Sequence, residues 1–487
     1  MRHLWPAGWG ERVALLATLA WAALLRLLFL REPIRFDEAA SALYYGDRSL
    51  LHALGGMSGN ANHVLASTSI WLAVRLLGWS EASVRLPTLL CGVALCWIFY
   101  AGLRWYTEDA VTALTGACVA AVSPWLVFFS VNARGYVWQT AFTALLAFVV
   151  LAFLRGTRTP AGALGLWAGA LTAAGAFAVR SMLVPALGLF AGGALMAARQ
   201  GARREAVRFH LAWAASAAAL TLAVFSVAAA ANGLTGLMGH VENMRQPRGV
   251  ALGETMSAYV DVWRLLFGSL GGGAAWIAGA ALVAGSVRTW RRLLPWAALL
   301  AAVLLAGLAV TAVLRVGLYP RVLLPLSALL IPLLAIAAQG LPPMLRWFLV
   351  ALLVAGYPVL WLQQDLLRVR NSTGDIPAAR PLAARLLARP DLGESVLVLP
   401  PIVDVGVAFY LREAGVSRAG IDGYDLAWDP ARHCEYRQVL AFVPEGEGPP
   451  RLEGAPWSPR LVRSGMTAEP VPGAGGALVR IPMAPCP

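Results

Sequence analysis

The sequence predicts an all-α polytopic membrane protein with about eleven transmembrane helices and a small soluble α/β domain at its C-terminus. Of the 487 residues, 59% are hydrophobic and only 13% are charged, whereas a soluble domain carries about a quarter charged residues. Water cannot solvate so apolar a surface, so lipid must surround most of the chain. The net charge of +13 is explained by arginines between apolar runs, so we expect membrane lipids and no nucleic acid as partners.

Apolar windows of about 20 residues define the predicted spans. They are 13–30, 86–105, 110–130, 137–154, 161–179, 182–198, 210–231, 265–286, 293–314, 321–340 and 343–362. Arginines cluster in the connections 155–160, 199–209 and 288–292, which the positive-inside rule assigns to the cytoplasm. With a cytoplasmic N-terminus, eleven spans put the tail from Gln363 outside.

The same orientation puts the connections 31–85 and 232–264 outside the membrane. The first is too long for a simple connector. Its apolar segment 64–78 is short and interrupted by Arg75, which predicts a helix lying on the membrane surface. The stretch from Asp37 to Leu54 is a second candidate of this kind.

The composition changes at about residue 363, where proline, glycine and charged residues become more frequent. We therefore expect a membrane domain over 1–362 and a soluble domain over 363–487. Strands are predicted at 395–401 and 437–444, with a helix at 405–415. Cys434 and Cys486 lie in this tail, and their spacing leaves open whether they form a disulfide.

Adjacent carboxylates follow the first span, at Asp37 and Glu38. Carboxylates at a membrane surface are costly to desolvate. Two interpretations are open: a catalytic base or metal ligand, or a helix start in which Asp37 is the N-cap and Glu38 favours the helix dipole.

Histidines and a further carboxylate lie in the same outer connections. His63 shares its connection with Asp37, while His240 and Glu242 lie in the segment 232–264. Imidazole and carboxylate groups together can hold a divalent metal ion. The alternative is that these are ordinary polar surface residues.

Arginines also occur on the outer side, against the charge bias. Arg134 and Tyr136 follow the third span, and Tyr319 and Arg321 precede a late span. Arginine suits bidentate contacts to phosphate, although it can also reach lipid headgroups. Together with the carboxylates and histidines, these residues suggest an outer site for a phosphate-bearing ligand.

Four segments in this order resemble the GT-C glycosyltransferases, in the branch of the protein O-mannosyltransferases and the lipid A aminoarabinose transferase. They are FDEAASALYYGD, the stretch from NANHVLAST to RLP, SPWLVFFSVNARGY and LYPRVLLPLSALL. The tail also resembles a soluble domain found in many bacterial members. The resemblance implies a bacterial inner membrane, with the active site and the C-terminal domain on the periplasmic or extracellular side.

The resemblance also implies roles for individual residues. Asp37 matches the acid taken as base or metal ligand, and Glu38 its partner. His63, Arg134, Tyr136, Tyr319 and Arg321 match positions near the donor phosphate. One departure is Asn132, in a turn where many relatives have an acid. A mechanism that needs two separated acids and a metal is therefore in doubt.

The leading hypothesis is a glycosyltransferase that moves a monosaccharide from a polyprenyl phosphate to an acceptor hydroxyl outside the membrane, with inversion. A divalent metal is the one cofactor it could need, and the sugar and acceptor stay open. The alternative is a transporter or flippase of a lipid-linked substrate, for which the spans offer few central charges. A catalytically inactive scaffold is a third hypothesis.

Overall fold

The computed structural model describes most of the chain. Residues 1–5, 7, 57–61, 244, 268–271, 357, 360–375, 401–402, 417–436, 446–460, 463, 465 and 486–487 are outside the description, as are the side chains of 231–243, 263–267, 272–282, 353 and 393. The chain forms two compact units. The helical unit is Met1–Leu30, Ser49–Ile70 and Arg85–Arg370, and the mixed unit is Arg31–Arg48, Trp71–Val84 and Asn371–Pro487.

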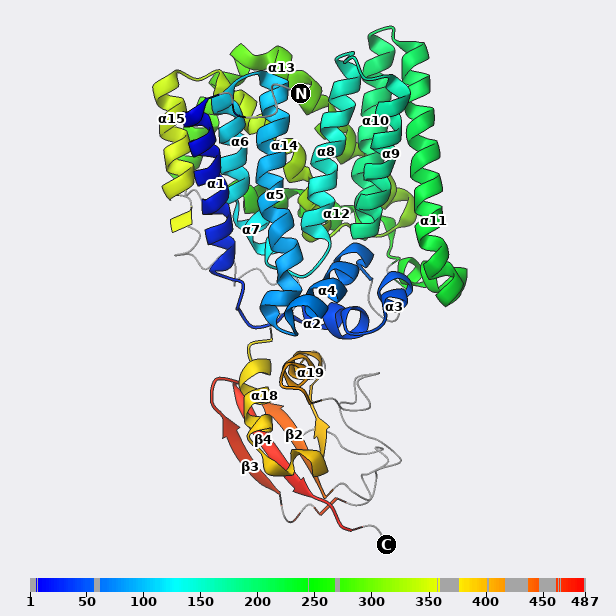
Figure 1. Ribbon diagram of the computed structural model, residues 1–487, viewed down its shortest axis with the longest axis vertical. Helices are drawn as coiled ribbons and strands as arrows, with labels where there is room; N and C mark the ends of the chain where they lie inside the picture. Colours follow the sequence, from blue (N-terminus) through cyan, green and yellow to red (C-terminus); the bar gives the residue numbers. More distant parts are fainter. Residues whose placement is uncertain are drawn as a thin grey trace. The chain divides into compact units, whose positions relative to one another are not determined.

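Long apolar helices lie side by side in the helical unit (Figure 1). In chain order the long and short α-helices of this unit are α1 (Trp9–Leu27), α3 (Leu50–Gly55), α4 (Val64–Leu77), α5 (Glu81–Thr107), α6 (Ala110–Val122), α7 (Pro124–Ser130), α8 (Tyr136–Leu154), α9 (Ala161–Ala178), α10 (Leu183–Arg199), α11 (Arg203–Asn243), α12 (Arg248–Phe267), α13 (Gly272–Leu314), α14 (Ser327–Gln339) and α15 (Pro343–Ala351). The last residues of α4 and the first residues of α5 belong to the mixed unit.

Among the described residues, seven helices are long and apolar enough to cross a membrane, or eight if the bent pair α6–α7 counts as one span. The polytopic membrane fold is thus confirmed. The first predicted span corresponds to α1, which carries the charged residues Glu11, Arg12 and Arg26 and is not among the seven. The last predicted span begins as the short apolar helix α15.

Two predicted connections are helical instead. Helix α13 runs without a break through 288–292, and the segment 232–264 is taken up by the end of α11 and most of α12. The expectation that these segments are non-helical loops is wrong, because an arginine favours helix almost as well as leucine does. Charge marks where a helix leaves the apolar layer, but it does not mark where the helix ends.

Glycine brings α9 and α11 into close contact. Gly165 and Gly169 are spaced one turn apart on α9, the small-residue spacing that lets helix backbones approach in a membrane. A Cβ on Gly165 would lie 2.3 Å from the Phe209 carbonyl oxygen, and one on Gly169 would lie 2.7 Å from the Ala217 nitrogen. Any side chain at either position would therefore push the two helices apart.

We expect Gly169→Ala to lower the unfolding free energy of the protein in detergent by about 1–3 kcal/mol, the usual cost of overpacking. The matched control is Gly162→Ala on the same helix, where an added Cβ meets nothing within 4 Å. Thermal unfolding followed by circular dichroism compares the two. Equal melting temperatures would mean that α9 and α11 are not packed as described.

A break at Pro124 separates α6 from α7 by 62°. Proline has no N–H to donate to Ala120, so the α6 carbonyls lose helical partners. The fully buried Arg26 of α1 replaces them, donating to the carbonyls of Ala121 at 3.1 Å and Ala120 at 3.4 Å. Its charge also suits the negative end of the helix dipole. The break turns the chain into α7 and the turn 131–135, where candidate site residues lie.

The mixed unit contains a four-stranded sheet with the order β1-β2-β4-β3. Its strands are β1 (Ser395–Val398), β2 (Gln438–Pro444), β3 (Thr467–Val471) and β4 (Gly476–Pro482), and its helices include α2 (Phe36–Ser41), α18 (Ala379–Leu387) and α19 (Val403–Glu413). β1 pairs parallel with β2, while β4 is antiparallel to both of its neighbours. The predicted α/β character is confirmed, although the unit also includes 31–48 and 71–84, which the sequence boundary gave to the membrane domain.

Candidate functional site

His63 is held in a buried loop before α4. The preceding side chain, Asn62, donates to the carbonyls of Ala53 at 2.9 Å and Gly56 at 3.0 Å and accepts from the Ser67 hydroxyl at 2.6 Å. These bonds fix the loop, and the His63 ring is 4% exposed. An imidazole this well placed is not the ordinary surface residue that the sequence left open.

The hydrogen bonds of His63 determine its tautomer. Its Nδ1 accepts the backbone N–H of Gly135 at 2.8 Å, so the neutral ring carries its proton on Nε2. That Nε2 lies 3.2 Å from Nη2 of Arg134. Both atoms are then donors, and neither can accept from the other. An anionic oxygen that bridges the two nitrogens from one side would accept from both, which is the chemistry of a phosphate site.

Burial, together with the charges of three arginines, keeps His63 neutral. Burial lowers the pKa of His63 well below its usual value of 6.5, and the charges of Arg134, Arg321 and Arg180 lower it further. His63 therefore stays uncharged at neutral pH. We call Arg134, Arg180 and Arg321 the cation cluster. They come from three places far apart in the sequence, and folding brings their charges within electrostatic range of one ring.

The segment that carries Arg321 is anchored to α12 and α13. The Leu318 N–H donates to the Thr255 hydroxyl at 3.0 Å, which in turn lies 3.0 Å from the Thr311 hydroxyl. The Arg321 guanidinium lies 5.8 Å from the ring centre of Tyr319. This Tyr319 ring, 42% exposed, can help to hold the arginine in place.

Tyr136 supports the imidazole from another side. Its buried ring meets the His63 ring edge to face, with 4.9 Å between the centroids. Packing of this kind fixes ring orientation. From the sequence, Tyr136 is expected to bind the donor phosphate. In the structure the Tyr136 ring contacts the His63 ring.

Arg180 was missed by the sequence analysis. It lies between two spans that the sequence predicts to be joined on the outer side, as Arg134 does. The signal that singled out Arg134, an arginine opposing the charge bias, was therefore present. It was overlooked because only two residues separate those predicted spans.

Asn132 occupies the turn beside Arg134. Its side chain is fully buried, and neither the amide nitrogen nor the amide oxygen has a hydrogen-bond partner among the described residues. An unsatisfied buried amide costs roughly 1–3 kcal/mol. A bound ligand or water would repay this cost, so the departure from an acid here leaves a polar group suited to binding.

Asp37 and Glu38 have different positions in α2, within the mixed unit. The N-cap is Arg35, whose N–H donates to the Glu38 carboxylate at 3.1 Å, so the interpretation of Asp37 as N-cap is wrong. Glu38 is fully buried and lies 3.7 Å from the Arg35 guanidinium. Glu38 therefore stabilises the helix start, whereas Asp37 is half-buried and does not cap the helix.

The predicted metal ligands fit a cation poorly at His63. One ring nitrogen accepts a backbone proton and the other faces a guanidinium, which would repel a divalent ion. Among the described residues, no group of three or more His, Cys, Asp or Glu side chains is close enough to hold a metal. His240 and Glu242, like Cys434 and Cys486, have side chains outside the described part of the chain.

Two solved structures share this architecture over nearly the whole chain. They are crystal structures of ArnT from Cupriavidus metallidurans. The apo form gives a TM-score of 0.63 at 13% identity, covering 96% of this chain and 97% of that one. The form bound to undecaprenyl phosphate gives 0.64 at 14% identity, covering 98% of each chain. The chain has the ArnT fold.

No protein-family model matches the chain, and no curated protein matches it. The likeness to ArnT is therefore one of fold. Four short sequence segments predicted a fold of the branch that contains the lipid A aminoarabinose transferase, and this prediction is confirmed. The ArnT structures cover 96–98% of this chain, which includes most of both compact units.

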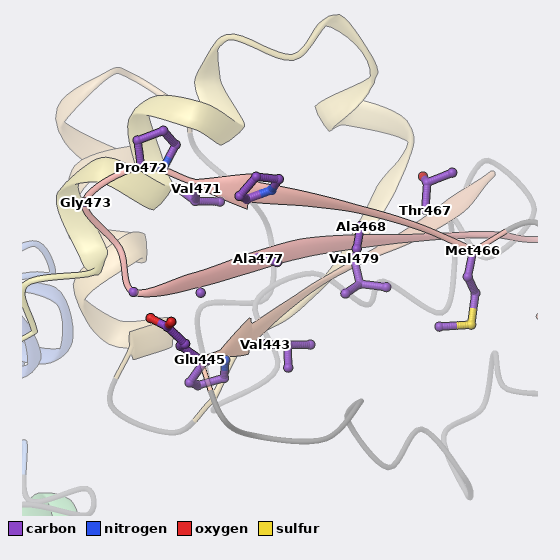
Figure 2. Close-up of a pocket in the computed structure, with 14 residues that line it drawn as sticks. Val443, Glu445, Met466, Thr467, Ala468, Val471, Pro472, Gly473, Ala477 and Val479 are labelled. Carbon is purple, nitrogen blue, oxygen red and sulfur yellow. The ribbon is translucent and has the colours of Figure 1, made fainter.

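A separate groove lies on the sheet of this ArnT-like fold, with a volume of about 760 Å³. Figure 2 shows Val443, Val479 and Met466 among its side chains, together with the turn at Gly473. Among the described residues that line it, Glu445 is the only ionisable one. The groove has the apolar character of a contact surface and none of the chemistry of the cation cluster.

Proposed function

We propose that the chain is a membrane glycosyltransferase. It takes a monosaccharide from a polyprenyl-phosphate donor and transfers it to an acceptor hydroxyl on the extracytoplasmic face. The observation that carries the proposal is the pair of facing donors, His63 Nε2 and Arg134 Nη2, 3.2 Å apart, backed by Arg180 and Arg321. A structure of the same fold holds undecaprenyl phosphate, which supports a lipid phosphate as the ligand.

In the proposed reaction Asp37 takes the proton from the acceptor hydroxyl. The hydroxyl oxygen attacks the anomeric carbon, and the bond from that carbon to the phosphate oxygen breaks. Lipid phosphate leaves, with its negative charge stabilised by the cation cluster. A single displacement of this kind inverts the configuration at the anomeric carbon. The energy comes from the donor bond, since the sequence has no nucleotide-binding motif.

The two ends of α8 support the proposed orientation. At its start lie Arg134 and His63. Beyond its other end, Arg155 donates to the Tyr106 carbonyl at 2.8 Å, and the Tyr106 hydroxyl donates to the Arg292 carbonyl at 2.8 Å. The 19 residues of α8 separate these ends by about 28 Å, close to the thickness of a hydrocarbon layer. The segments 155–160 and 288–292, both predicted to be cytoplasmic, are therefore linked through Tyr106 at the end of α8 that lies away from His63.

A transfer assay tests the proposal. Purified protein in lipid vesicles is given radiolabelled polyprenyl-phosphate sugars, one sugar at a time, with acceptor lipids, glycans or peptides and with or without chelator. Label recovered in a new product supports a transferase and identifies the sugar and the acceptor. Movement of intact labelled lipid between leaflets, without a new product from any donor, would support the flippase instead.

A further inference from the structure

The segment that contains Asp37 belongs to the same compact unit as the C-terminal domain. Residues Arg31–Arg48 group with Asn371–Pro487, and helix α19 of that domain packs against α2. No role for the C-terminal domain could be predicted from the sequence. Its contacts with this segment suggest one.

The start of the segment is anchored by Tyr410 of α19. The Tyr410 hydroxyl accepts the Ile34 N–H at 2.8 Å and donates to the Glu81 carboxylate at 2.6 Å. Arg380 of α18 also donates to Glu81 and reaches the Arg31 carbonyl at 2.8 Å. Burial and Glu81 both raise the pKa of Tyr410, so the hydroxyl keeps the proton that it donates.

The end of the segment is anchored by Arg412, two residues nearer the end of α19 than Tyr410. Its guanidinium binds both carboxylate oxygens of Asp47, at 2.9 and 3.0 Å. This bidentate geometry fixes orientation as well as distance.

A tryptophan ties the neighbouring stretch 71–84 to the same helix. The indole N–H of Trp79 donates to the Phe409 carbonyl at 3.1 Å, and the two rings pack with centroids 5.2 Å apart. From the same stretch, Arg75 donates to the carbonyls of Gly46 at 3.1 Å and Arg48 at 2.7 Å. Helix α19 and residues 71–84 thus hold the segment before and after Asp37.

We infer that the C-terminal domain positions the catalytic carboxylate, with Tyr410 and Arg412 of α19 as positioning residues for Asp37. This inference rests on the proposed function for its catalytic meaning. A base must stay within a fraction of an ångström of its productive place to be effective. A short helix of six residues has little stability of its own, so contacts from outside the segment must supply that precision.

Hydrogen–deuterium exchange of the full-length protein tests the anchoring directly, with Tyr410→Phe as the main variant. The change removes the hydroxyl and keeps the ring. We expect exchange in peptides covering 31–48 to become about tenfold faster, with unchanged exchange in α8 and β2. The matched control is Tyr106→Phe in α5, where the lost bond is to the Arg292 carbonyl.

The charged anchor has its own control and rescue. Arg412→Asp should also speed exchange in 31–48, and the swapped pair Asp47→Arg with Arg412→Asp should slow it again. Arg437→Gln breaks an exposed ion pair with Glu394 inside the sheet domain and should leave 31–48 unchanged. If exchange in 31–48 is the same in Tyr410→Phe, Arg412→Asp and wild type, the positioning inference is wrong, whatever the protein's activity.

Kinetics separate positioning from general damage. In a wild type that transfers sugar, Tyr410→Phe should lower kcat about tenfold and leave the donor KM unchanged. If exchange in 31–48 became faster while kcat stayed unchanged, Tyr410 would hold the segment without positioning Asp37 for catalysis, and the inference would be wrong. A wild type that transfers from no donor would refute the proposed function, while the exchange result would still decide whether the domain holds the segment.

Discussion

Asp37→Asn should lower sugar transfer about a thousandfold, within the range that general-base catalysis contributes. The amide has the shape of the carboxylate and cannot accept the acceptor's proton. Glu38 would still cap α2 through the Arg35 N–H, so the helix should persist. Initial rates in vesicles, at saturating donor and acceptor, measure the effect.

Glu38→Gln is the matched control for that prediction. The glutamine oxygen can still accept from the Arg35 N–H, so the helix start should survive and transfer should fall by less than about tenfold. Full transfer by Asp37→Asn, or an equal loss in Glu38→Gln, would contradict the assignment of the base to Asp37.

Arg134→Gln should lower kcat/KM for the donor about a hundredfold or more. The arginine provides charge-assisted bonds to the phosphate, and removing one donor to a developing anion typically costs a factor of 10² to 10³. A polyprenyl phosphate, the leaving product of the proposed reaction, should also inhibit the variant more weakly. The measurement is the dependence of rate on donor concentration, together with the inhibition constant of the lipid phosphate.

Arg155→Gln serves as the control at the other end of α8. Arg155 lies over the Tyr106 ring, 3.8 Å from its centre, and has no part in the proposed phosphate site. Its loss should leave the donor KM and the inhibition constant unchanged. If Arg134→Gln and Arg155→Gln had equal donor kinetics, the phosphate would have to bind elsewhere.

The candidate site was predictable in part because two simple physical rules apply to it. Lipid requires long apolar helices, and arginine on the outer side opposes the charge bias and so needs another reason. These rules singled out Arg134 and Arg321 from sequence, and the structure brings their charges to His63. Applied to a two-residue connection, the same rule would have found Arg180.

Other features could not be read from local sequence. The Tyr410–Ile34 bond joins residues 376 positions apart, and the Arg412–Asp47 pair joins residues 365 apart. No periodicity or composition encodes such pairings. The N-cap of α2 was misassigned for a different reason: aspartate is the commoner cap, but here a glutamate further along the turn reaches back to Arg35.

The most direct test of the account is a mass balance on the donor lipid. Vesicles with wild-type protein are given a polyprenyl-phosphate sugar and an acceptor, and mass spectrometry follows the intact donor, the free polyprenyl phosphate and the glycosylated acceptor. We expect equal amounts of free lipid phosphate and product, with an inverted anomeric configuration. Intact donor throughout, with every acceptor in the panel unmodified, would contradict it.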